Sequence, residues 1–214
     1  MKLYTYFRSS AAFRVRIALN LKDVAYEAVP RHLLRGGGEH RSAEYLAANP
    51  QGLIPALEDG GVVLAQSLAI IEYLEEKYPQ PPLLPREAVQ RAQVRAMALG
   101  IACDVHPLHN VSVTNYLSKE LKQDDDAVNR WRIHWIAKGL RALEELAKRH
   151  SGDGLYCFGR SVTLADVFLL PQLVSARRFE CDLGPYPTLC AIGAHLETLP
   201  AFAKAAPQAQ PDAE

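Results

Sequence analysis

Two serine residues, Ser9 and Ser10, lie where a short strand is expected to lead directly into a helix. The strand is expected over residues 3–7, and the serines occupy the first turn of the helix that follows Arg8. The start of a helix has unpaired backbone N–H groups and a partial positive charge, so it favours anions. A hydroxyl group there can donate to a thiolate and keep it ionised near neutral pH. This pattern predicts a site for a small anionic thiol rather than a covalent catalytic residue.

A second polar segment begins with the Ile54-Pro55 step just before an expected strand and ends with Gln66-Ser67 at the start of another helix. Free N–H groups at such a helix start suit a carboxylate, and Gln66 can add a side-chain donor. Two plainer interpretations stay open. Ser67 can be a simple helix cap, and Pro55 can be an ordinary loop proline.

The elements that must position these residues form a small α/β unit. Strand and helix patterns alternate through the first eighty residues, and the Asp59-Gly60-Gly61 sequence predicts a hairpin turn. In the first helix, Arg14 and Arg16 lie off the apolar stripe. Strands are expected over 3–7, 26–29, 55–58 and 62–65, and helices over 13–21, 42–48 and 67–78.

The segment Pro79–Pro85, with four prolines in seven residues, marks a boundary, because it cannot continue a helix and makes a semi-rigid linker. Everything after it is expected to be helical. A capping box from Thr163 to Asp166 in this half is expected to have only a structural role. The expected domains are 1–80 and 86–214, with a linker at 81–85.

The composition is that of an ordinary globular protein. Of the 214 residues, 49% are apolar and 22% are charged, and the formal net charge is +0, so no nucleic-acid partner is indicated. No apolar run reaches the roughly 18 residues that span a bilayer, and no signal peptide is visible, so a cytoplasmic location without membrane association is expected. The cysteines lack paired spacing, which predicts neither disulfides nor a metal site; they are Cys103, Cys157, Cys181 and Cys190.

This layout resembles that of the cytosolic glutathione transferases, and the sequence is similar to the zeta class, which includes the maleylacetoacetate and maleylpyruvate isomerases. The similarity runs from Leu3 to about Phe202. One departure is Ala11, where the zeta pattern usually has cysteine after the two serines, so the only sulfur nucleophile would belong to glutathione. The motifs that carry the resemblance are FRSSAAFRVR at 7–16, NPQGLIPAL at 49–57, Gln66-Ser67, PLHNVSV at 107–113 and LADVFLLPQLVSARRF at 164–179.

The resemblance implies an α/β thioredoxin-like N-terminal domain, an all-α C-terminal domain and glutathione as the cofactor. It also implies that Ser9, or else Ser10, stabilises the glutathione thiolate, whereas simple capping by both serines is the plain alternative. Lowering the thiol pKa by about two units requires about 2.7 kcal/mol, which one hydroxyl donor and a helix start can together supply. Further contacts implied for the tripeptide are the backbone of Ile54 beside a cis Pro55, and the residues His40, Gln66, Ser67, His106, Asn110 and Ser112.

Arginines decide which second substrate fits. Arg8 lies beside the expected thiol, Arg14 can border the site, and Arg177 and Arg178 lie in the helical half. A guanidinium group binds a carboxylate through a planar fork, so several of them near a thiolate suit a small dicarboxylate. Surface salt bridges are the alternative for each arginine, above all for Arg177.

Together with the resemblance, these residues predict cis–trans isomerisation of a maleyl keto-dicarboxylate, either maleylpyruvate or maleylacetoacetate, to its fumaryl isomer in the catabolism of aromatic compounds. The thiolate would add to the double bond, rotation would follow, and elimination would return glutathione while arginines hold the carboxylates. Two alternatives stay open: a glutathione transferase that conjugates small electrophilic or halogenated acids, and a non-catalytic binding protein with the same fold. The resemblance also implies a homodimer.

Overall fold

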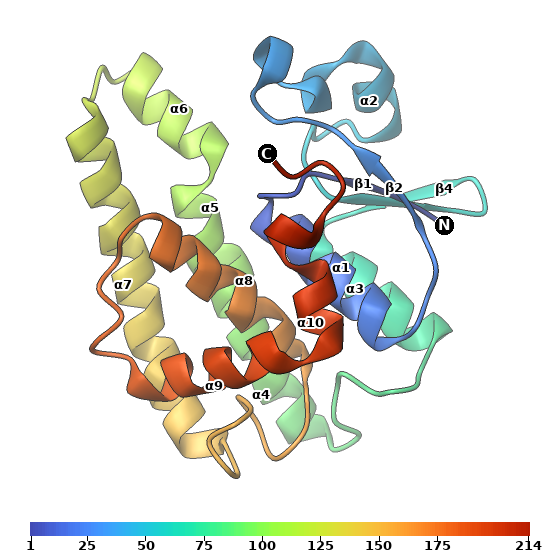
Figure 1. Ribbon diagram of the computed structural model, residues 1–214, viewed down its shortest axis with the longest axis vertical. Coiled ribbons are helices and arrows are strands. Elements are labelled where there is room, and N and C mark those ends of the chain that lie inside the picture. The colour runs from blue at the N-terminus through green and yellow to red at the C-terminus, as the bar shows by residue number, and fades with distance from the viewer. The chain divides into compact units, whose positions relative to one another are not determined.

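The computed structural model describes residues 1–214, and these form two compact units. The first unit comprises residues 1–82 and 198–214, and the second comprises residues 83–197 (Figure 1). The C-terminal seventeen residues thus pack with the N-terminal part of the chain, although the sequence-based division assigns them to the helical half. None of the helices combines the length and the apolar character needed to cross a bilayer.

The first unit is built on a four-stranded sheet with the order β2-β1-β3-β4. Strand β1 pairs in parallel with β2 and antiparallel with β3, and β3 forms a hairpin with β4. At the hairpin turn, Gly60 and Gly61 have φ angles of 59° and 83°, which glycine adopts without steric cost. The strands are β1 (Lys2–Thr5), β2 (Glu27–Pro30), β3 (Ala56–Asp59) and β4 (Val62–Ala65).

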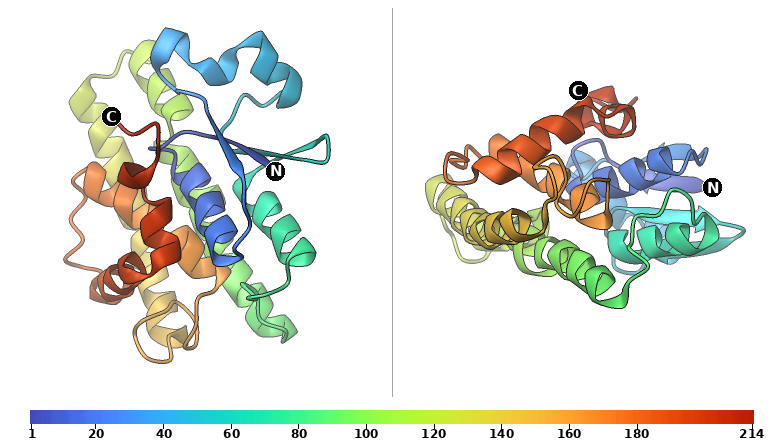
Figure 2. Two further views of the ribbon diagram at one scale, coloured as in Figure 1. Left: turned by 45° about the vertical axis from the view of Figure 1, so that its right-hand side comes forward. Right: turned by 90° about the horizontal axis from the view of Figure 1, so that it is seen from below.

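Helices cover both faces of this sheet. Helices α1 (Ser10–Leu21) and α3 (Ser67–Lys77) pack against each other on one face, and α2 (Ala43–Ala48) lies on the other (Figure 1). From the C-terminal segment, α10 (Pro200–Ala205) runs beside α1 (Figure 2). With α3 on one side and α10 on the other, α1 is covered almost completely, and this burial includes Arg14 and Arg16.

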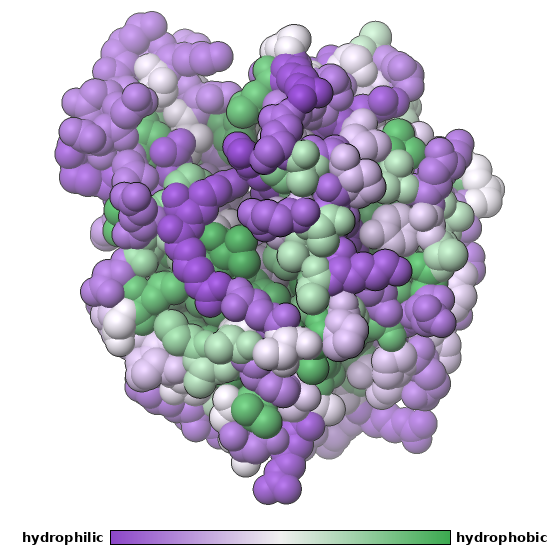
Figure 3. Space-filling model, viewed as in Figure 1, coloured by the Kyte–Doolittle hydropathy of each residue, from purple (hydrophilic) through white to green (hydrophobic).

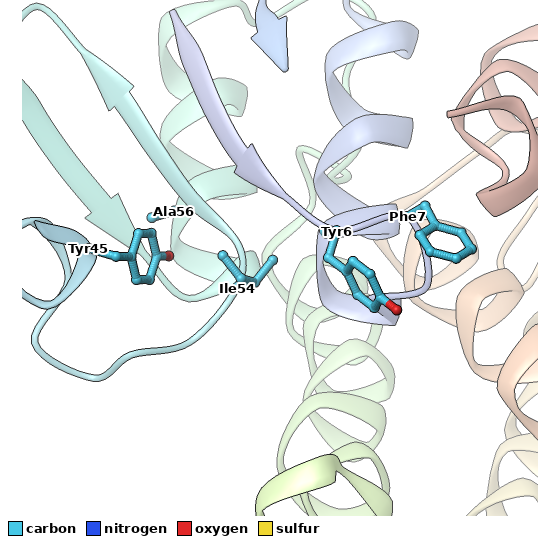
Figure 4. Close-up of a cluster of buried hydrophobic side chains, with 6 residues drawn as sticks. Tyr6, Phe7, Tyr45, Ile54 and Ala56 are labelled. Atoms are coloured by element: carbon cyan, nitrogen blue, oxygen red, sulfur yellow. The ribbon is translucent and has the colours of Figure 1, made fainter. Parts of the chain in front are cut away.

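A cluster of buried apolar side chains joins the end of β1 to the segment before β3. It extends from Tyr45 and Ala56 past Ile54 to Tyr6 and Phe7 (Figure 4). The Tyr6 and Phe7 rings meet edge to face with their centroids 4.9 Å apart, a favoured aromatic geometry. The two polar segments singled out in the sequence, at the serines and at the Ile54-Pro55 step, therefore share one hydrophobic support.

The second unit is built from helices, with one isolated β-bridge between Ser151 and Gly159 in the loop before α8. Hydrophilic side chains cover most of the visible surface of α6 and the beginning of α7 (Figure 3), whereas α8 is buried along most of its length. Its helices are α4 (Ala88–Leu99), α5 (His106–His109), α6 (Val111–Lys119), α7 (Asp125–His150), α8 (Leu164–Arg178) and α9 (Pro187–Thr198).

Two local features shape this helical unit. A π-helical turn, Gly100–Val105, joins α4 to α5 and carries Cys103, which is exposed. At the start of α8, the buried Asp166 carboxylate accepts hydrogen bonds from the backbone N–H and the hydroxyl of Thr163 and from the N–H of Cys157. The capping box expected from the sequence is therefore present, and it also fixes the loop before the helix.

A buried carboxylate ties α7 to α9. Glu144, on α7, accepts hydrogen bonds from the N–H groups of Thr188 and Leu189 in the first turn of α9, at 3.1 and 2.9 Å. Burial alone would raise the pKa of the Glu144 carboxyl, but these N–H donors hold the pKa below its ordinary value. The ionised form is thus favoured in the folded state, and Glu144 contributes stability above the ordinary glutamate pKa of about 4.3 that is lost as the pH falls.

Replacing Glu144 by glutamine should lower the free energy of unfolding at pH 7 by about 1–3 kcal/mol, because the charge-assisted hydrogen bonds to α9 are weakened. Urea unfolding measures the loss. The difference from the unsubstituted protein should shrink as the pH falls below about 4. Glu145→Gln is the matched control, since the neighbouring Glu145 is exposed and pairs with Lys148. Equal effects of the two substitutions would contradict this role of Glu144.

Candidate functional site

The junction between β1 and α1 holds the hydroxyl groups that the sequence singles out. Strand β1 ends at Thr5 rather than at residue 7, and the N–H of Ser9 donates to the carbonyl of Tyr6 at 2.9 Å to close a tight turn. The Ser9 hydroxyl caps α1 by accepting from the N–H of Ala12 at 3.2 Å. A hydroxyl oxygen that accepts this bond still has its own proton to donate. Capping and binding of an anion by Ser9 are therefore compatible.

The residues on either side of Ser9 differ in exposure. Ser10 is the first residue of α1 and is buried. Arg8 is exposed, and its guanidinium carbon lies 4.9 Å from the centroid of the Phe7 ring. Arg8 thus places an exposed positive charge next to the start of α1. Of the two serines, Ser9 is the more accessible and Ser10 is buried.

The Ile54-Pro55 peptide bond is cis, as the resemblance implies. The preceding turn is held by two side chains that the sequence reasoning missed. The hydroxyl of Tyr45 donates to the carbonyl of Leu53 at 2.6 Å, and the Asn49 side-chain amide donates to the same oxygen at 2.9 Å. Both Tyr45 and Asn49 are buried, so they fix the backbone that leads into Ile54.

The start of α3 differs in one detail from expectation. Gln66, rather than Ser67, is the N-cap residue, and its φ of 69° is unusual for a residue other than glycine. Ser67 is instead the first residue of the helix, and its hydroxyl oxygen accepts a hydrogen bond from Arg14 Nη1 at 3.3 Å. The buried Arg14 guanidinium therefore adds a positive charge to the partial positive charge of a helix start. The side chain of Gln66 donates to Gln51 at 2.8 Å.

His40 lies in the short helical segment Glu39–Arg41 and is buried. Burial, with a smaller effect of the neighbouring Arg41 charge, lowers the pKa of the imidazole, so His40 is neutral at pH 7. The carbonyl oxygen of His40 lies next to Gly52: a Cβ atom built onto Gly52 would lie 3.3 Å from this oxygen. His40 thus contacts the loop that leads to Ile54 and Pro55.

Three predicted residues lie in the helical unit at α5 and α6. Asn110 is the N-cap of α6, and its side-chain oxygen accepts from the N–H and from the hydroxyl of Ser112 at 2.7 and 2.9 Å. His106 begins α5 directly after the π-helical turn, and its ring meets the His109 ring edge to face. The structure brings these polar groups together at one bend of the chain.

The two neighbouring arginines at the end of α8 have different surroundings. Arg177 forms an ion pair with Glu197 on the surface. Arg178 stacks on Phe179, with its guanidinium carbon 4.5 Å from the ring centroid, and Arg132 of α7 stacks on the same ring at 5.0 Å. Burial lowers the pKa of Arg132, and its Nε is buried without a hydrogen-bond partner. Arg132 carries no motif of its own, so no sequence pattern could have identified it.

The predicted residues thus form two groups, each described within its own unit. In the first unit, two helix starts, at Ser9 and at Gln66-Ser67, lie at the ends of β1 and β4, and they suit a ligand with an anionic thiol and a carboxylate. In the second unit, imidazole, amide and hydroxyl groups lie at α5 and α6, and guanidinium groups surround Phe179. Both groups of residues therefore offer hydrogen-bond donors that suit anions.

Comparison with known proteins shows which family this chain is similar to. The family model described as the glutathione S-transferase N-terminal domain matches residues 3–82. A protein of Vibrio cholerae serotype O1, named a probable maleylacetoacetate isomerase, is 52% identical over 211 residues, which are 99% of this chain and 97% of that protein.

Two solved structures resemble this chain over its full length. The holo structure of a maleylpyruvate isomerase, described as a bacterial glutathione S-transferase of the zeta class, has a TM-score of 0.96 and 49% identity, with both chains covered completely. The maleylacetoacetate isomerase of Methylobacterium extorquens AM1, solved with bound malonate and glutathione, has a TM-score of 0.94 and 41% identity, again over both complete chains. The two-part fold expected from the sequence is confirmed, and the chain belongs to the glutathione S-transferase family, in its zeta class with the maleylacetoacetate and maleylpyruvate isomerases.

Proposed function

We propose that this protein is a glutathione-dependent cis–trans isomerase that converts a maleyl keto-dicarboxylate, maleylpyruvate or maleylacetoacetate, to its fumaryl isomer. The observation that carries the proposal is the full-length similarity to an isomerase solved with glutathione and malonate, a small dicarboxylate. The donor sets of this chain have the same chemistry, because they suit a thiolate and several carboxylates.

The first unit is proposed to hold glutathione. Its γ-glutamyl carboxylate would bind at the start of α3, where Gln66 and Ser67 offer donors and the buried Arg14 adds positive charge. The backbone of Ile54, beside the cis Pro55, would pair with the cysteinyl part of the tripeptide. The residues proposed for further contacts to the peptide are His40, His106, Asn110 and Ser112.

Ser9 is proposed to be the donor to the sulfur, with Ser10 as the second candidate. When bound, glutathione supplies the sulfur nucleophile for reversible addition to the double bond of the substrate. The Ser9 hydroxyl keeps its proton available while its oxygen caps α1, so it can stabilise the thiolate without losing the cap. The partial positive charge at the start of α1 acts in the same direction.

Arg8 and Arg178 are proposed to bind the substrate carboxylates and to stabilise negative charge that develops during the reaction. Each guanidinium carbon lies over an aromatic ring, Arg8 over Phe7 and Arg178 over Phe179, and a guanidinium group binds a carboxylate through its planar N–H edge. Arg177 is the weaker of the two candidates on α8, because Glu197 already neutralises its charge.

The wider setting is proposed from the same similarity. The protein would act in the catabolism of aromatic compounds, and it would be a homodimer. A cytoplasmic location is proposed because all four cysteines are free, as is usual in a reducing compartment.

The activity itself is tested with a maleyl keto-dicarboxylate and glutathione in far less than stoichiometric amount. We expect the substrate absorbance to change to that of the fumaryl isomer with many turnovers per glutathione and no loss of free thiol. Consumption of one thiol per turnover would instead identify a conjugating transferase. Binding of glutathione without any reaction of either kind would indicate a binding protein.

Replacing Ser9 by alanine should raise the thiol pKa of bound glutathione by about one unit, because a hydroxyl hydrogen bond contributes about 1 kcal/mol or more. The ultraviolet absorbance of the thiolate, followed against pH, measures this shift. Ser9→Thr is the control, since it retains both the cap and the hydroxyl donor. A thiol pKa that is the same in Ser9→Ala and Ser9→Thr would exclude Ser9 as the donor.

Replacing Arg178 by lysine should raise the KM for the dicarboxylate about tenfold or more and leave the affinity for glutathione nearly unchanged. Lysine keeps the charge but loses the planar fork that binds carboxylate oxygens. Steady-state kinetics at saturating glutathione measure the change. The same substitution at Arg177 should have little effect, because Glu197 already pairs with that side chain. The opposite ranking would assign the carboxylate to Arg177.

A further inference from the structure

Both backbone polar groups of Phe7, the residue two before Ser9, are bound by charged side chains, one from helix α1 and one from the C-terminal tail. The carbonyl oxygen of Phe7 accepts a hydrogen bond from Arg16 Nη2 at 3.1 Å. The N–H of Phe7 donates to Asp212 Oδ2 at 3.0 Å. Phe7, the residue directly before the Arg8–Ser10 segment, is therefore held by a guanidinium and by a carboxylate.

The guanidinium of Arg16 is completely buried and fixed on several sides. It donates to the carbonyl of Ala205 and to the hydroxyl of Thr5, each at 3.0 Å, and to the carbonyl of Tyr6 at 3.3 Å. Burial lowers the pKa of Arg16 to about 10, with the nearby Tyr26 and Asp212 raising it in part, so Arg16 is charged at neutral pH. It therefore holds the end of β1 against the C-terminal segment.

The carboxylate of Asp212 reaches Phe7 because the C-terminal tail is itself held in place. On one side, the Gln210 side-chain amide donates to the carbonyls of Lys204 and Ala206 at 2.9 and 3.0 Å. On the other side, Glu214 forms an ion pair with Arg35. The second oxygen of Asp212, Oδ1, is buried and accepts no hydrogen bond. The hydrogen bond from the Phe7 N–H and the nearby positive charge of Arg16 therefore stabilise this carboxylate.

Fixing Phe7 in this way fixes the direction of the next peptide. The peptide unit is planar, so holding the Phe7 carbonyl on Arg16 also sets the direction of the Arg8 N–H on its opposite side. The chain then reaches Ser9, whose N–H closes the turn on Tyr6. A catalytic donor must be held within about 0.5 Å of its productive position, and a loop can do this only if its supports are rigid.

We propose that Asp212 is a positioning residue for the Arg8–Ser10 segment: by accepting from the Phe7 N–H, it holds the Ser9 hydroxyl in the orientation that stabilises the bound thiolate. The inference rests on the proposed function, because it assigns the C-terminal tail a part in the same site. Asp212 acts through Phe7 and touches neither cofactor nor substrate.

A simple electrostatic role for Asp212 makes the opposite prediction. Removing a negative charge near a thiol favours the thiolate and lowers the thiol pKa. Loss of the support for Ser9 weakens the hydroxyl donor and raises the thiol pKa. The sign of the shift therefore separates the two roles.

The experiment compares Asp212→Ala, which removes the acceptor, with Asp212→Asn, whose side-chain oxygen can still accept from the Phe7 N–H. Glu214→Ala is the control in the same tail, since Glu214 contacts Arg35 and His32 rather than Phe7. Two measurements are made on each variant. Amide hydrogen exchange of residues 7–12 is followed without any ligand, and the thiol pKa of bound glutathione is followed by thiolate absorbance.

In Asp212→Ala we expect faster exchange at residues 7–12 and a rise of about one unit in the thiol pKa, with kcat lowered severalfold at neutral pH and the KM for the dicarboxylate nearly unchanged. Asp212→Asn should stay close to the unsubstituted protein in both measurements, as should Glu214→Ala. Unchanged exchange in Asp212→Ala, or a fall in the thiol pKa, would overturn the inference. If the unsubstituted protein fails to isomerise a maleyl keto acid, the proposed function fails, whereas hydrogen exchange still decides whether Asp212 holds the segment.

Discussion

The structure of the first unit depends on one buried cation. The Arg16 guanidinium is completely buried, so its N–H groups need oxygen acceptors from the protein, and the chain supplies these from β1, from the turn after β1 and from the end of α10. The same bonds satisfy the carbonyls of Tyr6 and Phe7, where the strand has ended and the helix has not begun. The Ser9 hydroxyl caps α1 directly after this turn.

Residues close together in the sequence were the ones whose local structure could be predicted. The two serines at a strand–helix junction, the glycine turn at residues 60 and 61, and the capping box of Thr163 and Asp166 each have a local pattern, and the structure contains all three elements. The zeta-class motifs extended this to the whole fold, as the solved relatives confirm. The assignment of individual site residues stays a prediction that the proposed substitutions address.

Residues that meet across long stretches of chain could not be predicted. Asp212 and Phe7 are 205 positions apart, and no periodicity links them. Helical periodicity placed Arg14 and Arg16 off the apolar stripe, but α3 and α10 cover those sides of α1 as well, so both are buried. The C-terminal segment looked like the end of the helical half, yet α10 packs along α1 in the first unit. In each case tertiary packing overrides a local pattern.

The π-helical turn between α4 and α5 has a practical consequence for chemical labelling. Cys103 on that turn is exposed, whereas burial raises the pKa of the thiols of Cys157, Cys181 and Cys190 and so lowers the fraction of reactive thiolate at each. A maleimide dye or spin label would therefore attach first to Cys103, three residues before His106. Inhibition by such reagents would report steric crowding at α5 rather than alkylation of a nucleophile, and a Cys103→Ser background is the appropriate one for spectroscopic probes placed elsewhere.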